Sequence, residues 1–325
     1  MSSCWYFSGE GVTPLTPVPI LAILGPTASG KSTLGIELAL RHRGEIISCD
    51  STAVYRGFDI GTDKVPMAQR RGVSHHLIDV VEPTDEYTAA RYVRDTVAVI
   101  EEIYSRGNRP ILVGGTGLYY RALVRGLFPG PGADARMRDR LEAIAGTRGV
   151  EHLHRMLKRV DPPSATRIQP RDRKRMIRAL EVYFLTGTPL TDHFAATVSP
   201  LSSYKTMSIA LSPPMTLIHE RVKKRVDAQF EQGLMEEVRG LLARGVPETA
   251  RPFGGLVYRQ ALEHLHGVRN EADTRELITR ENRHYARRQL IWFRKEPNLV
   301  WLPTPGEDPE TLTAVEALLM ASGTS

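Results

Sequence analysis

Residues 25–32 read Gly-Pro-Thr-Ala-Ser-Gly-Lys-Ser and match the complete pattern G-x-x-x-x-G-K-[ST] of a phosphate-binding loop. The backbone N–H groups of such a loop, with the N-terminus of the helix behind it, bind a diphosphate or a triphosphate. Lys31 is expected to reach the terminal phosphate, and the hydroxyl of Ser32 is expected to bind Mg²⁺. The pattern leaves open whether the phosphates belong to a nucleotide or to another leaving group.

Two further polar residues follow predicted strands. Asp50 comes directly after the apolar stretch 45–49, and Thr116 lies in the turn 114–117 after the apolar stretch 110–113. Ligands of open α/β sheets bind beyond the carboxyl ends of the strands, so we expect Asp50, Thr116 and the phosphate loop to line one cleft. Asp50 could organise Mg²⁺ or accept a proton from a substrate, and either residue could instead cap a helix.

The elements that must position these residues alternate between short apolar strands and amphipathic helices, which is the pattern of a parallel α/β sheet. We expect strands over 19–24, 45–49, 76–81, 110–113 and 204–211, and helices over 33–40, 91–106, 215–244 and 274–295. A weaker helical pattern follows Pro303.

Changes in composition divide the chain into four parts. Residues 1–18 lack the basic start of a signal peptide, so we expect them to be a disordered leader and not a signal peptide. Residues 19–128 and 199–325 are expected to form the α/β core. Residues 129–198, which begin Pro-Gly-Pro-Gly, are expected to form an inserted helical domain. Within that insertion, 134–178 carries 13 Lys and Arg against 6 Asp and Glu, which suggests a polyanionic partner such as nucleic acid.

The overall composition excludes several classes of protein. The chain has 325 residues, of which 41% are hydrophobic and 25% are charged, as in a soluble globular protein. No apolar run is long enough to span a bilayer, so we expect no membrane contact. Two cysteines, Cys4 and Cys49, are too few for a disulfide scaffold and fit a cytoplasmic protein.

Several segments together resemble the tRNA dimethylallyltransferase family, and the likeness covers nearly the whole chain after the leader. Besides the phosphate loop they are ISCDS at 47–51, VYRGFDIGT at 54–62, HHLID at 75–79, VGGTGLY at 113–119, RMIRALEV at 175–182 and YARRQ at 285–289. These enzymes transfer a dimethylallyl group from dimethylallyl diphosphate to N6 of the adenosine 3′-adjacent to the tRNA anticodon. The resemblance implies a P-loop NTPase-like parallel sheet with an inserted helical domain. It also implies Mg²⁺ as cofactor and the anticodon stem-loop as partner, and we expect a monomer.

The resemblance also assigns roles to residues. Asp50 matches the base that takes a proton from the adenine amine, Thr116 matches the residue that orients this amine, and Arg225 matches an arginine that binds the diphosphate. Arg221 is the nearest rival for that last role. The expected diphosphate site consists of Gly25, Pro26, Thr27, Ala28, Ser29, Gly30, Lys31 and Ser32. The expected tRNA contacts are Asp50, Ser51, Thr52, Thr116, Arg138, Lys174, Arg175, Arg178, Tyr258 and Arg259.

Three positions depart from the family pattern. Ala53 stands where glutamine is usual, which removes one expected contact to a base. Val257 stands directly before Tyr258, where glycine is usual, and a β-branched residue does not easily adopt a positive φ. The local backbone or the tRNA contact is therefore expected to differ there. Ser32 replaces the commoner threonine and keeps the hydroxyl.

Two other function classes remain open at this point. A nucleotide or small-molecule kinase would use the loop on ATP, with Asp50 activating a hydroxyl and the basic insertion acting as a lid. The length and charge of the insertion and the Gly-Gly-Thr-Gly turn argue against it. A non-catalytic RNA-binding ATPase switch would need an acidic residue where the strand 110–113 instead runs into Gly114. ATP hydrolysis or nucleotide affinity would distinguish both from the transferase.

Overall fold

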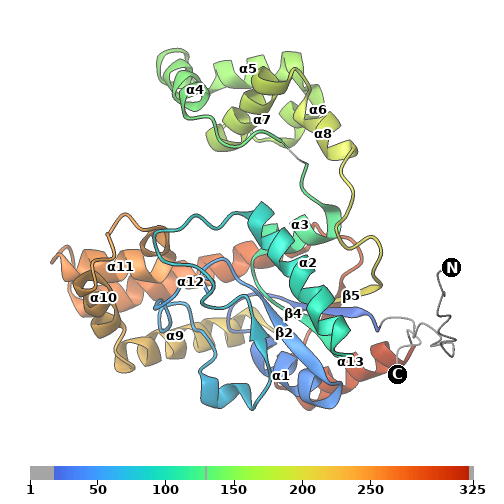
Figure 1. Cartoon of the computed structure of the whole chain (residues 1–325). Coiled ribbons are helices and arrows are strands. Elements are labelled where there is room, and N and C mark those ends of the chain that lie inside the picture. The colour runs from blue at the N-terminus through green and yellow to red at the C-terminus, as the bar shows by residue number, and fades with distance from the viewer. Residues whose placement is uncertain (1–17, 129, 322–325) are drawn as a thin grey trace, which may run out of the picture. The chain divides into compact units, whose positions relative to one another are not determined.

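The computed structural model describes residues 18–128 and 130–321, so the expected leader, except for Val18, lies outside the described residues. The chain forms two compact units. Unit 1 comprises residues 1–121 and 201–325, and unit 2 comprises residues 122–200. Figure 1 shows the course of the chain through both units, and each unit is described by itself below.

In the described ranges, unit 1 contains one sheet of six parallel strands in the order β3-β2-β4-β1-β5-β6. The strands are β1 (Ile20–Leu24), β2 (Gly44–Cys49), β3 (His75–His76), β4 (Arg109–Gly114), β5 (Thr206–Leu211) and β6 (Val300–Leu302). Gly114 lies opposite both Leu24 and Cys49 in the strand register. The neighbouring strands β2, β4 and β1 therefore end at one level, and Asp50 and Gly25 follow β2 and β1 at the same edge of the sheet. The predicted α/β class is confirmed.

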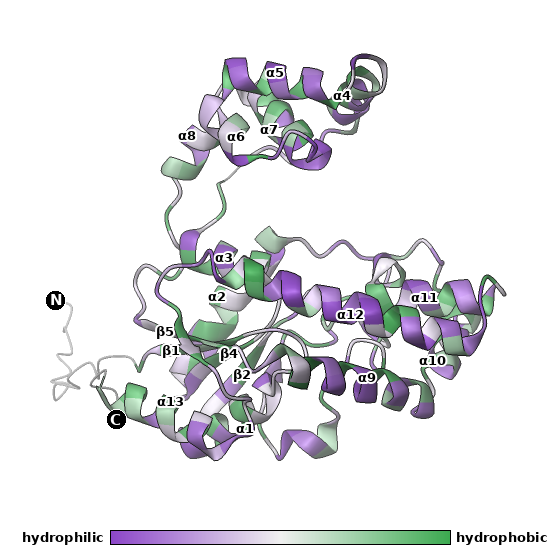
Figure 2. Ribbon diagram, turned by 180° about the vertical axis from the view of Figure 1, so that it is seen from behind, coloured by the Kyte–Doolittle hydropathy of each residue, from purple (hydrophilic) through white to green (hydrophobic). Residues whose placement is uncertain are grey.

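Helices cover both faces of this sheet, as Figure 1 shows. The described helices outside unit 2 are α1 (Lys31–Arg41), α2 (Ala89–Ser105), α3 (Gly117–Arg125), which ends in unit 2, α9 (Met215–Glu231), α10 (Leu234–Ala243), α11 (Leu256–Leu265), α12 (Glu271–Phe293) and α13 (Pro309–Ala321). Short 3₁₀ helices span Met67–Arg70 and Arg251–Gly254. Hydrophilic and hydrophobic residues alternate along α9 and α12 in Figure 2, as expected of helices with one buried face.

The phosphate loop is fixed at both of its ends by buried elements. Before it, all five residues of β1 are buried. After it, Leu34 and Leu38 lie one turn apart on α1 and are fully buried in the core that β1, β4, β5 and α13 also form. Apolar burial before and after the loop therefore holds it in place, although the loop itself has no large apolar side chain.

Two predicted elements differ from the structure. The strand expected over 76–81 ends at His76, because Leu77 and Asp79 adopt φ values of +59° and +56°. The chain after His76 instead pairs with an earlier turn, where the N–H groups of Asp79 and Val80 donate to carbonyl oxygens of residues 53 and 54. The helical stretch expected over 215–244 is broken at Gly233, whose φ is +95°, into α9 and α10.

Unit 2 is a small helical bundle with its own core. Its described helices after α3 are α4 (Ala135–Arg148), α5 (Val150–Val160), α6 (Pro162–Arg167), α7 (Arg173–Thr186) and α8 (Leu190–Ala195). Aspartate side chains cap α4, α6 and α7 by accepting hydrogen bonds from backbone N–H groups in the first turn. Leu141, Leu153, Leu157, Met176 and Leu180 are almost fully buried at the centre.

In the part of the chain that the structure describes, no helix combines the length and the apolar composition that crossing a membrane requires.

Candidate active site

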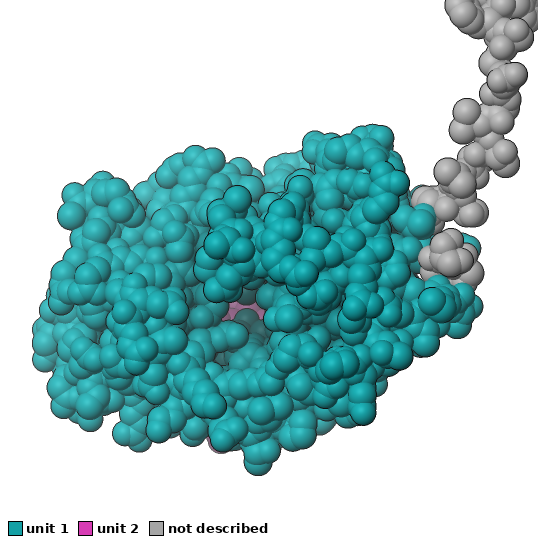
Figure 3. Space-filling view, turned by 90° about the horizontal axis from the view of Figure 1, so that it is seen from below, with its two compact units in different colours: residues 1–121, 201–325 teal, residues 122–200 magenta. Residues whose placement is uncertain are grey.

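Unit 1 contains a cavity of about 540 Å³ at the carboxyl ends of its central strands. The residues that line it include Lys31, Asp50, Asp63, Arg225 and Gln289. Figure 3 shows that unit 1 is hollowed near the centre of the face drawn there. The cavity combines several cationic side chains and the carboxylates of Asp50 and Asp63 with the amides of the phosphate loop, as a site for a charged ligand requires.

The phosphate loop is held at two points by distant parts of the chain. At Thr27, Gln289 of α12 accepts a hydrogen bond from Thr27 N at 2.8 Å and donates one to Gly115 O at 3.0 Å. At Ser29, the N–H of Gly306 donates to Ser29 O at 2.9 Å. A side chain at Gly30 would collide with the backbone of Gly306, because a Cβ there would lie 2.6 Å from Gly306 N. These contacts fix the loop before any ligand binds.

Lys31 points back over the loop, and its Nζ donates to Pro26 O at 2.5 Å. Burial, and secondly the nearby positive charge of Arg225, lower the pKa of Lys31 to about 7. An anion in the cavity would stabilise the charged form, so this lysine is prepared to gain a proton together with an anionic ligand.

Two arginines of α9 approach the phosphate loop but differ in what they contact. Arg225 lines the cavity, and its Nη1 donates to Thr27 Oγ1 at 2.7 Å and to Asp63 Oδ2 at 3.0 Å. Arg221 forms an ion pair with Glu307 and does not line this cavity. The geometry therefore favours Arg225 over Arg221 as the ligand-binding arginine.

Asp50 is oriented by the turn that it begins. Its Oδ1 accepts hydrogen bonds from Thr52 N at 2.8 Å and from Thr52 Oγ1 at 2.7 Å. Among the described residues no hydrogen bond to Oδ2 is found, and this oxygen remains available to a ligand. Thr116 lies beside the turn, where its Oγ1 accepts a hydrogen bond from Ser51 N at 3.1 Å.

Comparison with known proteins bears on what this cavity binds. Residues 53–296 match the family model described as IPP transferase. The chain belongs to the IPP transferase family. It is 45% identical over 293 residues to the tRNA dimethylallyltransferase of Solibacter usitatus, covering 90% of this chain and 95% of that protein. It is 44% identical to the tRNA dimethylallyltransferase of Geobacter metallireducens, covering 91% and 96%.

Solved structures agree with this membership. The tRNA isopentenylpyrophosphate transferase of Bacillus halodurans superimposes with a TM-score of 0.69 at 35% identity, over 93% of this chain and 96% of that one. A eukaryotic dimethylallyltransferase acting on tRNA superimposes with a TM-score of 0.77 at 26% identity, over 93% and 78%. The resemblance stated from the sequence is confirmed, and the kinase alternative finds no support in these matches.

Four of the basic residues expected to contact tRNA lie in unit 2, where they fall into two groups. Lys174 and Arg175 are exposed at the start of α7. Arg138 and Arg178 are partly buried and bind the carboxylate of Glu181, whose side chain is fully buried. Arg138 donates to it at 2.9 and 3.1 Å, and Arg178 donates at 2.7 Å. The second pair therefore also neutralises a buried carboxylate in unit 2.

The segment around Val257 adopts a regular conformation. Val257 is buried within α11 and is not among the residues with positive φ, so valine causes no strain there. Tyr258 is 2% exposed, and its hydroxyl donates to Glu237 Oε1 at 2.5 Å and accepts from Gly61 N at 3.0 Å. Arg259 is half exposed and forms an ion pair with Glu281. Of the two expected contacts, only Arg259 has its polar group at the surface.

Gln289 and Asp63 are among the cavity residues that were not assigned a role from the sequence. Gln289 lies in a segment that carries the family resemblance, but nothing in that segment indicates that its amide reaches a loop 262 residues away. Asp63 directly follows another such segment and gives no sequence signal of its own.

The cavity residues fit Mg²⁺ only when a bound ligand supplies some of the oxygen atoms around the ion. Among the described residues no group of three or more histidines, cysteines, aspartates or glutamates is arranged to bind a metal. Ser32 lines the cavity beside Lys31 and offers a hydroxyl oxygen there. Mg²⁺ commonly takes few protein ligands and completes its shell with water and substrate phosphates, so this donor set is compatible with the ion.

Proposed function

We propose that this protein transfers a dimethylallyl group from dimethylallyl diphosphate to N6 of the adenosine 3′-adjacent to the anticodon of tRNA. One observation carries the proposal most directly. The same cavity is lined by the phosphate loop and by Asp50, whose Oδ2 accepts no hydrogen bond from the residues that the structure describes. A diphosphate leaving group and a base for the attacking amine are the two requirements of this reaction.

The phosphate loop, Lys31 and Arg225 act on the leaving group. As the bond between the allylic carbon and the diphosphate oxygen breaks, negative charge increases on the diphosphate. Groups that are fixed before the reaction stabilise such charge without reorganising. Lys31 and Arg225 are held in this way by Pro26 O and by Thr27 Oγ1. Mg²⁺, when bound through Ser32 and the diphosphate oxygens, would neutralise part of the same charge.

Asp50 acts on the adenosine amine. An aromatic amine is a poor nucleophile because its lone pair is delocalised into the ring. As the N6–carbon bond forms, the amine becomes acidic, and Asp50 Oδ2 can accept its proton. Thr116 fixes the turn that carries Asp50 through its hydrogen bond from Ser51 N and offers its hydroxyl for orienting the amine.

Unit 2 supplies basic groups for the RNA. Adenosine must leave the base stack to reach a cavity, which costs less in a single-stranded loop than in a duplex. Contacts of Lys174 and Arg175 with phosphates would offset this cost by releasing counterions.

The test is mass spectrometry of nucleosides from unmodified tRNA incubated with the protein, Mg²⁺ and dimethylallyl diphosphate. We expect adenosine to gain a dimethylallyl group, and we expect no gain when ATP replaces the allylic diphosphate. Lys31→Met should abolish the gain, and Lys205→Met, which changes an exposed lysine outside the cavity lining, should preserve it. Consumption of ATP without modification of adenosine would overturn the proposal.

A further inference from the structure

Asp63 is the carboxylate nearest to the arginine of the diphosphate site, and the reaction scheme gives it no task. Its Oδ2 lies 3.0 Å from Arg225 Nη1, and the same nitrogen lies 2.7 Å from Thr27 Oγ1 in the phosphate loop. Nη1 of Arg225 therefore donates hydrogen bonds to both the phosphate loop and Asp63. Both Asp63 and Arg225 line the cavity.

Arg225 requires a counterion to stay in this position. It lies close enough to Lys31 to lower the pKa of that lysine, so the two positive groups repel each other. A free arginine side chain also carries about 2 kcal/mol of rotamer entropy, which favours conformations away from the loop. The carboxylate of Asp63 opposes both tendencies, because it attracts Arg225 and accepts a directed hydrogen bond.

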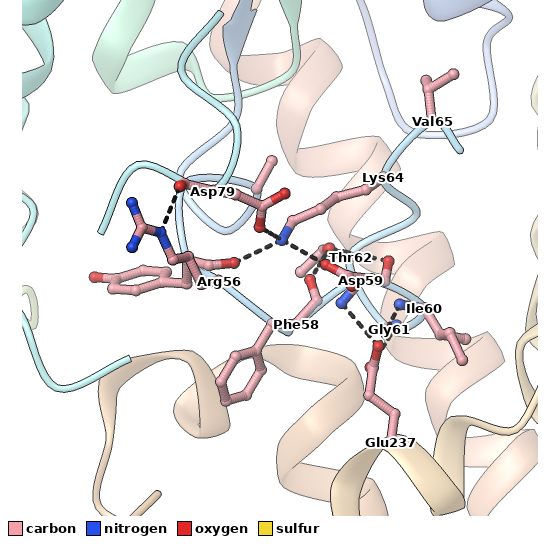
Figure 4. A network of polar contacts seen from close by, with 12 residues as sticks. Arg56, Phe58, Asp59, Ile60, Gly61, Thr62, Lys64, Val65, Asp79 and Glu237 are labelled. Carbon is pink, nitrogen blue, oxygen red and sulfur yellow. Dashed lines mark hydrogen bonds and ion pairs between the residues drawn. The ribbon is translucent and has the colours of Figure 1, made fainter. Parts of the chain in front are cut away.

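The segment that carries Asp63 is fixed firmly by its neighbours (Figure 4). Glu237 of α10 accepts hydrogen bonds from the backbone N–H groups of Asp59 and Ile60, both at 2.8 Å. The side chain of Lys64 is only 5% exposed and binds three acceptors around it. They are Tyr55 O at 2.6 Å, Asp59 Oδ1 at 2.7 Å and the carboxylate of Asp79.

Asp63 itself adopts an unusual backbone conformation within this segment. Its φ is +55°, which aspartate tolerates better than most residues, and its N–H donates to Ile60 O at 3.1 Å. Gln229 of α9 donates to the same carbonyl at 3.1 Å, one turn along the helix from Arg225. Two helices and a buried lysine thus determine where the carboxylate of Asp63 lies.

We propose that Asp63 is a positioning residue that holds Arg225 against the phosphate loop, and that Glu237 and Lys64 fix the segment 59–65 for this purpose. The inference rests on the proposed function, since it takes the ligand of Arg225 to be a diphosphate. Asp63 itself does not contact the reacting atoms. It acts by keeping Arg225 ready, so that binding of the diphosphate does not have to order this side chain.

A double-mutant cycle tests the coupling. Inorganic pyrophosphate with Mg²⁺ is titrated by calorimetry into the full chain and into Asp63→Ala, Arg225→Ala and the double variant. We expect each single substitution to raise the Kd for pyrophosphate about tenfold. In the Arg225→Ala background, Asp63→Ala should change the Kd less than about twofold, because its partner is already absent.

Matched variants separate positioning from folding. Asp273→Asn changes an exposed aspartate on the first turn of α12 and should leave the Kd unchanged. Asp63→Asn keeps the shape of the side chain and one oxygen acceptor. Its Kd for pyrophosphate should therefore lie between that of the native protein and that of Asp63→Ala. It also serves if the alanine variant does not fold.

Two results would overturn the inference. Tighter or unchanged binding of pyrophosphate by Asp63→Ala would show that the carboxylate competes with the diphosphate for Arg225 or has no part in positioning it. If Asp63→Ala raised the Kd for pyrophosphate equally in the native and the Arg225→Ala backgrounds, Asp63 would act without Arg225. If the native protein binds pyrophosphate but does not modify tRNA, the proposed function fails, and the cycle still decides the role of Asp63.

Discussion

The guanidinium of Arg138 lies 2.9 Å from the carboxylate of Glu181, a side chain that is completely buried in unit 2. Burial alone would raise the pKa of Glu181, but hydrogen bonds from Arg138 and Arg178 outweigh this effect and hold its pKa below the usual range. Two arginines that were expected to contact tRNA therefore also neutralise a buried charge. Substitution of either one is therefore expected to lower the stability of unit 2, apart from any effect on RNA binding.

We predict that Arg138→Ala lowers the free energy of unfolding by about 1.5–3 kcal/mol, because Glu181 loses one of its charged partners. Arg175→Ala should lower it by less than about 1 kcal/mol, since Arg175 is mostly exposed. Both variants should weaken tRNA binding and reduce its dependence on salt. Urea unfolding and binding titrations at several salt concentrations measure the two effects. Equal stability of the two variants would contradict a structural role for Arg138.

For Asp50→Asn we predict that kcat falls by about 10²–10⁴-fold, the range typical of a lost general base. Affinity for pyrophosphate should be preserved or increased, because the substitution removes a negative charge that lies near Lys31. Single-turnover kinetics with tRNA and calorimetry with pyrophosphate test the two halves separately. A wild-type rate in this variant would exclude Asp50 as the base.

Lys31 should make diphosphate binding depend on pH. The pKa of Lys31 is about 7 in the folded protein and 10.5 without perturbation. Between pH 7 and pH 10.5 the unfolded chain therefore binds more protons than the folded chain, and the free energy of unfolding rises with pH. A bound diphosphate favours the charged lysine. We therefore predict that, near pH 8.5, the native protein takes up close to one proton more than Lys31→Arg when pyrophosphate binds. The arginine of that variant is charged with or without the ligand.

Calorimetry in buffers of different ionisation enthalpy measures this uptake. The comparison with Lys31→Arg removes the protons that pyrophosphate itself exchanges, because they are common to both proteins. Identical proton uptake by the two proteins would show that Lys31 is already charged before the ligand binds.

Gln289 should contribute to both stability and diphosphate affinity. In Gln289→Ala the partly buried Thr27 N and the buried Gly115 O each lose their partner, which we expect to cost about 2 kcal/mol in total and to raise the Kd for pyrophosphate. Gln232→Ala, at an exposed glutamine after α9, is the matched control and should be neutral. Thermal unfolding and calorimetry check the pair, and an unchanged Kd in Gln289→Ala would show that α12 does not hold the loop.

The sequence predicted the parts of the site that local patterns determine. β1, β2 and β4 are runs of buried apolar residues that end in polar or glycine-rich turns, so their positions and the alignment of Asp50 with the phosphate loop followed from general rules. Lys31, Ser32 and Arg225 do line one cavity with Asp50.

Other parts depend on contacts between distant residues, which periodicity does not encode. Gln289 and Gly306 reach the phosphate loop from more than 260 residues away along the chain. The error at 76–81 has a similar origin. An apolar run there predicts a strand, but the ion pair between Asp79 and Lys64 and the pairing with residues 53 and 54 bend the chain at Leu77.

The contact of Gly306 with the phosphate loop also has a consequence for how the protein is made. A ribosome synthesises the loop at residues 25–32 long before it synthesises β6 and the segment that packs on the loop at Ser29. Until residues 300–307 have left the ribosome, the loop lacks this support and the ion pair of Arg221 with Glu307. A nascent chain therefore completes its anion site only after residues 300–307 have been synthesised, when the basic helices of unit 2 have already been made.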